Sequence, residues 1–162
     1  EEVASPKEKS INTIIEPIKQ YRGAVEFEKL RLAVEKKEKK PVVFLLTYGN
    51  KVMRKARARF SSSFFACAGY EIIDNNGFDT IEDGVKAVKN AKADIIVICS
   101  SDDEYAEIVP EVDKLIKDEA IIVVAGAPAC MNELKNKGVE NFIHIKSNIL
   151  DELKNYNKLL GI

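Results

Sequence analysis

The stretch VVFLLTYGNKVMRKARARF, residues 42 to 60, has the pattern of a buried strand, a short turn and a helix. Residues 42–47 are almost entirely apolar, as in a parallel strand that is covered on both faces. The turn ends at Gly49-Asn50, and the expected helix opens with five cations, Lys51, Arg54, Lys55, Arg57 and Arg59. A helix N-terminus carries partial positive charge and free N–H groups, so it favours anions. Three explanations stay open: a bound anion, an acidic partner, or a site that has lost an earlier role.

The helix that follows this turn is expected to run from residue 51 to residue 68 and to end at Gly69. Its apolar residues recur at spacings of four, four, four and three, which places them on one helical face. We expect that face to be buried, with the residues Val52, Ala56, Phe60, Phe64 and Cys67.

The strand and helix pattern then repeats to the end of the chain. Further strands are expected over residues 70–73, 93–99, 120–125 and 141–145. Helices are expected over 80–91, capped by Thr80, over 103–117, and from the turn GAP to Lys137. Ser147 is expected to cap a last helix, whose inner face is formed by Ile149, Leu150, Leu153, Tyr156 and Leu160. This alternation predicts an α/β, doubly wound, flavodoxin-like fold, with a five-stranded parallel sheet in the order 2-1-3-4-5.

Residues 1–40 differ from the rest of the chain, because they are rich in Lys and Glu. One amphipathic helix is expected within them, with Phe27, Leu30 and Val34 at helical spacing. We therefore predict a helical linker or arm over residues 1–40 and a Rossmann-like domain over residues 41–162.

The composition excludes several classes of protein. With 25 Lys and Arg against 26 Asp and Glu, the net charge is -1, which argues against a nucleic-acid surface. No apolar run is long enough to span a membrane, and no signal peptide is visible. Three cysteines are too few for a disulfide scaffold, so they indicate reduced thiols in a cytoplasmic protein. Cys130, near a helix start, is a candidate reactive thiol, although a small buried apolar residue is the simpler interpretation.

Ligands of an open parallel sheet bind outside the carboxyl ends of its strands, where the strand order reverses. Three segments should line that crevice, 48–50, 99–103 and 125–127. Asp102 and Asp103, with Lys146 after the fifth strand, resemble a phosphoacceptor site. The loop after the first strand, however, supplies no carboxylate for Mg²⁺. The simpler expectation is that Ser101 or Asp102 caps the next helix, while Asp103 and Glu104 complement its dipole.

Two other kinds of chemistry are weakly supported. The loop LTYGNK offers a Thr and a Gly-Asn turn to an FMN phosphate, but it lacks a dense set of hydroxyls, and the chain has no Trp. The single histidine, His144, lies in the apolar alternation FIHIK and is expected to be a packed or edge residue. No Ser-His or Cys-His pair follows from the spacing, so we assign no catalytic and no metal-ligating residue.

Several segments along the chain carry a collinear resemblance to a known family. They are VEFEKLR, PVVFLLTYGN, ARFSSSFFACAGYEIIDNNGF, ADIIVICSSDDEYAEIVPEV, AIIVVAGAP and KGVENFIHIKSNILDEL. From about residue 17 to residue 162 the chain resembles the carboxy-terminal, cobalamin-binding-type domain of methylmalonyl-CoA mutases, and most of all the small-subunit form.

The family motifs that hold cobalamin are altered in this chain. In family members with the cofactor, the first loop carries Asp-x-His-x-x-Gly, whose histidine ligates cobalt, followed by Ser-x-Leu after the third strand and Gly-Gly after the fourth. This chain has neither Asp nor His between Tyr48 and Arg57, with Met53 or Arg54 near the ligand position. The resemblance therefore implies a degenerate pocket, made of Tyr48, Gly49, Asn50, Met53, Arg54, Ser100, Ser101, Asp102, Ala125 and Gly126.

The resemblance implies a heterodimer in which a large subunit carries adenosylcobalamin and interconverts methylmalonyl-CoA and succinyl-CoA. The chain would then be a non-catalytic part of the small subunit that stabilises the large one and holds no cofactor itself. No nucleic acid and no membrane are expected as partners. Two alternatives stay open: a flavodoxin-like FMN electron carrier, and a cobalamin-binding module without a lower histidine ligand.

Overall fold

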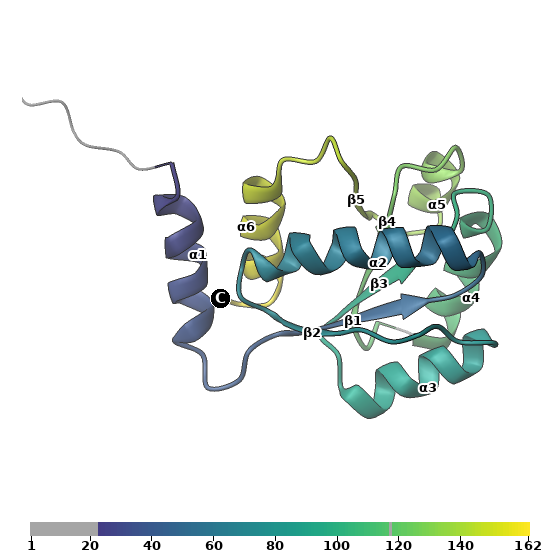
Figure 1. The fold of residues 1–162 in the computed structure, drawn as a ribbon, viewed down its shortest axis with the longest axis horizontal. Coiled ribbons are helices and arrows are strands. Elements are labelled where there is room, and N and C mark those ends of the chain that lie inside the picture. Colours follow the sequence, from purple (N-terminus) through teal and green to yellow (C-terminus); the bar gives the residue numbers. More distant parts are fainter. Residues whose placement is uncertain (1–22, 117) are drawn as a thin grey trace, which may run out of the picture.

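The computed structural model describes residues 23–116 and 118–162, and it contains the predicted parallel sheet (Figure 1). Five strands pair in the order β2-β1-β3-β4-β5, and every pairing is parallel. They are β1 (Val42–Thr47), β2 (Glu71–Ile73), β3 (Ile95–Cys99), β4 (Ile121–Ala125) and β5 (Asn141–Ile143). All residues of β1 and β3 are buried, because these central strands are covered on both faces. The fold predicted from the sequence is confirmed.

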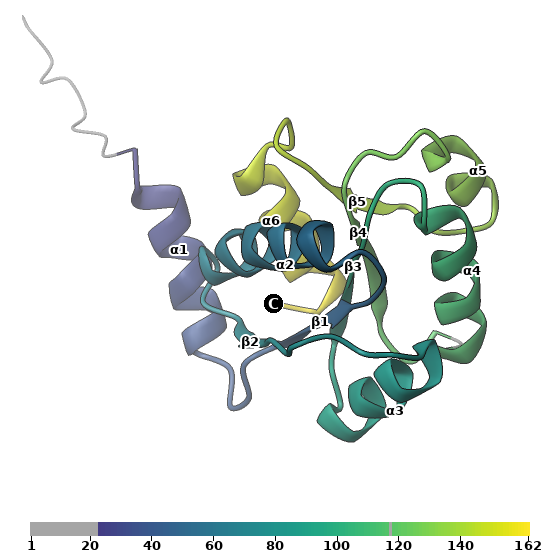
Figure 2. The ribbon, with the colours of Figure 1, turned by 45° about the vertical axis from the view of Figure 1, so that its right-hand side comes forward.

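Helices cover the two faces of the sheet (Figures 1 and 2). On one face lie α1 (Val25–Glu35), α2 (Lys51–Ala66) and α6 (Ile149–Leu159), which share a core with alternate strand residues such as Leu45 and Val97. On the other face lie α3 (Ile81–Ala91), α4 (Tyr105–Ile116) and α5 (Met131–Asn136), packed on residues such as Leu46 and Ile98. Within the described residues, no helix is both long and apolar enough to cross a bilayer.

Of the two helix caps predicted at Thr80 and Ser147, the first is confirmed and the second is wrong, and Asn50 supplies a cap that was not predicted. The side chain of Asn50 accepts the N–H groups of Val52 and Met53 at the start of α2, and Thr80 accepts the N–H of Asp83 at the start of α3. The prediction that Ser147 caps α6 is wrong, because Asn148 does so. The hydroxyl oxygen of Ser147 instead accepts the N–H of His144 at 3.0 Å and closes the turn after β5.

The apolar stripe predicted for α2 is wrong in its first half. Val52 is 78% exposed, Ala56 is exposed and Phe60 is half-buried. The helix is rotated so that Phe64 and Phe65 enter an aromatic cluster, in which the Phe65 ring lies 5.2 Å from that of Tyr156. The small side chains of Ala58 and Ser61 then face the sheet, where they let the helix approach closely. The helix thus has one apolar face in the core, while Val52 and Ala56 lie outside it and Phe60 lies at the edge of the core.

In the carboxy-terminal part of the fold, the strand β5 and the helix α5 are shorter than the sequence predicted. β5 ends at Ile143, so His144 and Ile145 follow the strand instead of belonging to it. The helix α5 begins at Met131, well after the GAP turn. Ile149, expected on the inner face of α6, is 37% exposed, while Leu153 and Tyr156 are buried as expected.

The helix α1 packs onto the domain through the residues that the sequence pattern singled out. Leu30 and Val34 are buried and Phe27 is partly buried against the same core cluster, and α1 lies beside α6 (Figure 2). The part of the predicted arm before residue 23 lies outside the described residues. The division of the chain at residue 40 stays a prediction.

We expect Val34→Ala to lower the free energy of unfolding by about 2 kcal/mol, because two buried methyl groups are lost and a cavity is left. Val34 is fully buried, whereas Leu32 on the same helix is 54% exposed. The control Leu32→Ala should change the free energy by no more than about 0.5 kcal/mol. Urea unfolding measures both variants, and equal effects would show that α1 is not part of the packed core.

Candidate functional site

The loops that follow β1, β3 and β4 meet at one edge of the sheet, as expected for the carboxyl ends of adjacent parallel strands. The N–H of Tyr48 donates to the carbonyl of Cys99 at 3.2 Å. The hydroxyl of Ser100 donates to the carbonyl of Tyr48 at 2.9 Å. The hydroxyl of Tyr105 donates to the carbonyl of Ala125 at 2.6 Å. The three segments proposed from the sequence are therefore linked to one another at the position of the predicted crevice.

The carboxylate of Glu104 sits between the first two of these loops. It accepts the hydroxyl of Ser100, the hydroxyl of Ser101 at 2.7 Å and the N–H of Ser101 at 3.2 Å. Both carboxylate oxygens also lie 3.2 Å from the N–H of Asn50, the residue that caps α2. A Cβ atom at Gly49, where φ is +74°, would collide with this carboxylate. The anion favoured at the N-terminus of α2 is thus supplied by the chain itself.

The same contacts keep Glu104 ionised. Partial burial acts to raise its pKa, but hydrogen bonds from Ser100 and Ser101 and from the backbone N–H of Asn50 outweigh it and lower the pKa to about 2. The carboxylate is therefore charged near neutral pH, where it accepts these hydrogen bonds. It is not poised to act as a general acid or base near neutral pH.

An ion pair closes the side of the crevice next to β4. Nη2 of Arg57 on α2 lies 2.9 Å from Oδ1 of Asp102. A Cβ atom built at Gly126 would lie 2.9 Å from that same oxygen and 3.3 Å from the guanidinium carbon of Arg57. Gly126 also has φ of +150°, in the region that favours glycine. The backbone after β4 and this ion pair are therefore packed together without room for a group between them.

The hydroxyl of Tyr105 links the carboxyl ends of β3 and β4. Its side chain is fully buried, and its hydroxyl accepts the N–H of Ser100 at 3.1 Å while donating to the carbonyl of Ala125. Burial raises the pKa of this phenol, so the hydroxyl stays protonated. The buried backbone groups at the mouth of the sheet are satisfied by a protein side chain.

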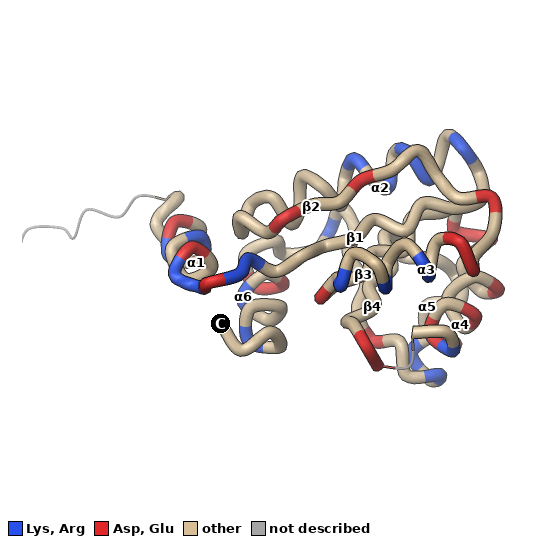
Figure 3. Tube along the Cα trace, turned by 90° about the horizontal axis from the view of Figure 1, so that it is seen from below, with Lys and Arg blue, Asp and Glu red and all other residues tan. Residues whose placement is uncertain are grey.

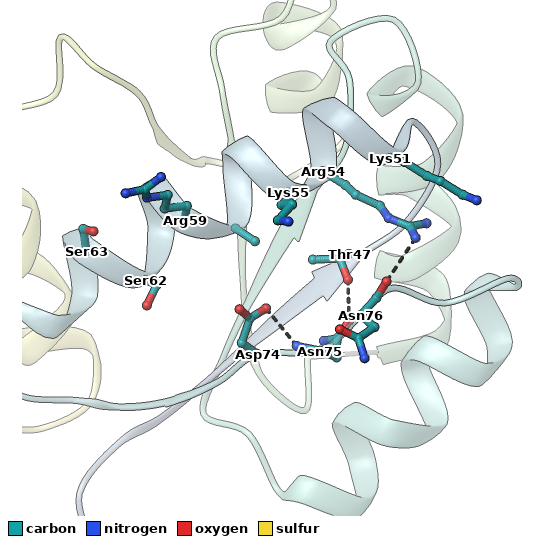
Figure 4. Close-up of a pocket in the computed structure, with 11 residues that line it drawn as sticks. Thr47, Lys51, Arg54, Lys55, Arg59, Ser62, Ser63, Asp74, Asn75 and Asn76 are labelled. Carbon is teal, nitrogen blue, oxygen red and sulfur yellow. Dashed lines mark hydrogen bonds between the residues drawn. The ribbon is translucent and has the colours of Figure 1, made fainter.

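Arg54 belongs to a second feature, a groove of about 550 Å³ between α2 and the loop after β2 (Figure 4). Its guanidinium donates to the carbonyls of Gly49 and Asn76, at 3.3 and 3.1 Å, and so ties the two loops together. The hydroxyl of Thr47 donates to the side chain of Asn75 on the same side. Residues lining the groove are Thr47, Lys51, Arg54, Lys55, Ala58, Arg59, Ser62, Ser63, Asp74, Asn75 and Asn76.

The proposed helix caps after β3 are wrong. Ser101 donates its hydroxyl to Glu104 instead of accepting a helical N–H, and Asp102 pairs with Arg57. The cause is that the chain makes a turn over residues 102–104 before α4 begins at Tyr105. Met53, a further residue of the predicted pocket, is half-buried on α2, and its backbone N–H donates to the side chain of Asn50 at 3.1 Å.

The remaining candidate residues lie away from the crevice centre or in the core. Nδ1 of His144 accepts the N–H of Lys146 at 3.2 Å, so the imidazole is engaged in its own turn after β5. Lys146 and Asp103 are exposed. Cys130 is half-buried at the start of α5 and packs against the core cluster of that face. This contact agrees with the simpler expectation of a small apolar residue.

Glu104 and Tyr105 are the residues whose roles sequence reasoning missed. Glu104 was expected only to complement a helix dipole, and no role at the crevice was predicted for Tyr105. One signal was present, because Ser101 and Glu104 have the S-x-x-E spacing of a capping box. Half of that motif forms, since Glu104 reaches back to the N–H of Ser101. Nothing in the sequence predicted its link to Asn50, which is 54 residues away.

The residues present do not fit a cobalt-ligating site. The only imidazole of the chain is held in the turn after β5, and the loop after β1 offers no substitute donor. The crevice is filled by Glu104 and by the pair of Arg57 with Asp102. In the parts of the chain that the structure describes, no group of three His, Cys, Asp or Glu residues is arranged to hold a metal ion.

Comparison with known proteins identifies one close relative by sequence. The chain is 57% identical, over 148 residues, to a methylmalonyl-CoA mutase small subunit from Porphyromonas gingivalis (strain ATCC BAA-308 / W83). The match covers 91% of this chain and 24% of the relative, so the chain spans about a quarter of the length of that protein. This identity confirms the resemblance noted in the sequence. No family model matches the chain.

Comparison of structures supports the fold. The chain is similar to a cobalamin-binding protein from Desulfitobacterium hafniense DCB-2, with a TM-score of 0.51 and 18% identity. The similarity covers 85% of this chain and 71% of that one. The flavodoxin-like arrangement of a five-stranded parallel sheet is shared, and at this identity the likeness concerns the fold alone.

We expect the contribution of Glu104 to stability to depend on pH. Its pKa in the folded protein is lowered below the ordinary value of 4.5, so it stabilises the fold above that pH and loses the effect as pH falls toward about 2. Glu104→Gln should cost about 1 kcal/mol at neutral pH, a modest value because the group is partly hydrated.

Urea unfolding at several pH values tests this expectation. The difference in the free energy of unfolding between the native chain and Glu104→Gln should become smaller below about pH 4.5. The exposed Glu107, three residues further on in α4, gives the matched control Glu107→Gln. A gap for Glu104→Gln that is independent of pH would contradict the assignment of an ionised, hydrogen-bonded carboxylate.

Tyr105→Phe should lower the free energy of unfolding by about 1–3 kcal/mol, because two buried backbone groups lose their partner. Tyr48→Phe is the matched control, since the hydroxyl of Tyr48 makes no hydrogen bond within the described residues. The control should remain within about 0.5 kcal/mol of the native chain. If thermal or urea unfolding ranks the two variants equally, the Tyr105 hydroxyl does not hold the crevice together.

Proposed function

We propose that this chain is a non-catalytic domain of a methylmalonyl-CoA mutase small subunit, which binds no cobalamin and stabilises a large catalytic subunit. The observation that carries the proposal is the filled crevice. Glu104, from the loop after β3, accepts the N–H of Asn50 in the loop from which family members ligate cobalt, and Arg57 with Asp102 lies against Gly126. The 57% identity to a small subunit supports the assignment to this side of the heterodimer.

In this proposal the chemistry belongs to the large subunit. That subunit would hold adenosylcobalamin and interconvert methylmalonyl-CoA and succinyl-CoA. This chain offers no group suited to acid–base or nucleophilic catalysis at the crevice. Burial raises the pKa of the Cys99 thiol to about 12, so the one thiol next to the crevice is inert. We accordingly assign it no mutase activity by itself.

The proposed division of labour extends to the two parts of the chain. Residues 41–162 would form the domain, and residues 1–40 would link it to the rest of the subunit, with α1 held against α6. The cysteines at positions 67, 99 and 130 are all free thiols, which suits the reducing cytoplasm where we place the heterodimer.

A cobalamin-binding module without a lower histidine is the second candidate, favoured by the similarity in fold to a cobalamin-binding protein. It would need Glu104 and the Arg57–Asp102 pair to move aside and leave several charged groups without partners. Such unpaired charges cost more than a typical hydrogen bond, so the closed arrangement is favoured. A flavodoxin-like electron carrier is the third candidate function, and no particular contact among the described residues favours it.

Absorption spectroscopy of the purified chain with added hydroxocobalamin, and separately with FMN, tests the proposal. We expect both spectra to equal those of the free compounds, because the crevice has neither a cobalt ligand nor an open phosphate site. The same measurements are made in parallel on the variant Glu104→Ala with each added compound. A shifted cobalamin spectrum with the native chain, or retention of either compound on gel filtration at micromolar concentration, would overturn the claim that this domain binds no cofactor.

Association with the large subunit is tested by gel filtration of the mixed proteins. Co-elution is expected, and separate elution at about 10 μM of each would contradict a stabilising role of this domain.

A further inference from the structure

The solvent side of α2 carries an apolar stripe that the core uses only at one end, because Val52 and Ala56 are exposed while Phe60 is half-buried against the core cluster. Val52, Ala56 and Phe60 recur every four residues and therefore lie along one line of the helix. They line a shallow groove of about 710 Å³. We call this surface the α2 outer face and define it by Lys51, Val52, Lys55, Ala56, Arg59, Phe60 and Ser63.

A row of cations runs beside this stripe. Lys51, Lys55 and Arg59 are all exposed and are also spaced by four residues. The helix has five cations and no carboxylate. Within the described residues, Arg57 is the only one of the five in an ion pair. Figure 3 shows Lys and Arg along α2, on the opposite side of the sheet from α3 and α4.

This arrangement destabilises the isolated domain in two ways. Like charges four residues apart on a helix repel each other, and cations in the first turns oppose the helix dipole. Val52, at 78% exposure, leaves an aliphatic side chain in water. Both effects would be relieved by one kind of surface, which is apolar at its centre and bears Asp and Glu around it.

We propose that the α2 outer face docks onto an acidic, apolar-centred surface of the large subunit. This inference rests on the function proposed above and names the part of the chain that meets the partner. A 16-residue helix is about 24 Å long. Its outer face is smaller than the roughly 800 Å² that each partner buries in a stable interface. It therefore supplies the centre of the contact, and neighbouring surfaces extend it.

The charge of the α2 outer face favours an acidic protein surface over a second copy of this chain or a membrane. In a two-fold contact between copies of this chain, the rows of Lys51, Lys55 and Arg59 would face each other and repel. An anionic membrane would accept the cations, but a stripe of three apolar residues with Ala56 at its centre buries little area in a bilayer. An acidic protein surface matches both the row of charges and the narrow stripe.

The test uses the full chain and the immobilised large subunit, with the dissociation constant measured by biolayer interferometry at about 0.05 M and about 0.3 M salt. The variants are Lys51→Glu/Lys55→Glu and Val52→Asp. Both place carboxylates in the first turns of α2, where they favour the helix, so both should fold. We expect each to weaken binding by about tenfold or more, and the charge variant to flatten the salt dependence.

Two matched controls lie on other surfaces. Lys86→Glu/Lys114→Glu makes the same change of charge on α3 and α4, and Leu32→Asp makes a similar apolar-to-acidic change on α1. Both controls should bind within about twofold of the native chain. Thermal unfolding verifies that every variant is folded.

The outcomes separate the two proposals. If the native chain binds and the α2 variants bind equally well, or weaken no more than the controls, the docking surface is wrong while the proposed function stands. If the native chain does not bind the large subunit, the proposed function fails and the docking surface fails with it. The native chain and the α2 variants are also tested for binding to phosphatidylglycerol vesicles. If the α2 variants lose binding to the vesicles but still bind the large subunit like the native chain, the face belongs to a membrane and the inference is overturned.

Discussion

The carboxylate of Glu104 is the contact on which the mouth of this sheet depends. The N-terminus of α2 presents free N–H groups and a positive dipole end, and the first turns add cations to it. An anion nearby is therefore favoured. Glu104 provides it from the loop after β3, and the same oxygens hold the hydroxyls of Ser100 and Ser101. At the crevice, a carboxylate of the chain itself balances the local positive charge. On the outer side of α2, no carboxylate of the described residues pairs with the cations.

This distinction separates the cations that the sequence presents as one group. Arg57 reaches Asp102, and Arg54 is bound to two backbone carbonyls. Both arginines hold loops together. Lys51, Lys55 and Arg59 are exposed, and they line both the groove beside Arg54 and the α2 outer face. The opening stretch therefore contains two arginines that hold loops together and a row of exposed cations along the edge shared by two grooves.

The strands and their order could be predicted because their signal is local. Runs such as residues 42–46 and 95–99 are apolar throughout, and alternation with helices leaves few topologies. The rotation of α2 could not be predicted in the same way, because the helix has two apolar faces. Which one is buried depends on Phe65 meeting Tyr70 and Tyr156, residues that come from distant parts of the chain.

The crevice shows the same limit. Its position followed from the ends of β1, β3 and β4, but its contents did not. The bonds from Asn50 to Glu104 and from Arg57 to Asp102 join residues 54 and 45 positions apart, and no periodic pattern links them. A cofactor loop that loses its ligand leaves polar backbone groups and charges that must find partners, since unsatisfied buried groups destabilise a fold. Carboxylate, guanidinium and phenol groups fulfil that requirement here. In the proposed role, the domain keeps the architecture of a cofactor-binding fold because its own side chains now satisfy the groups that a ligand would otherwise contact.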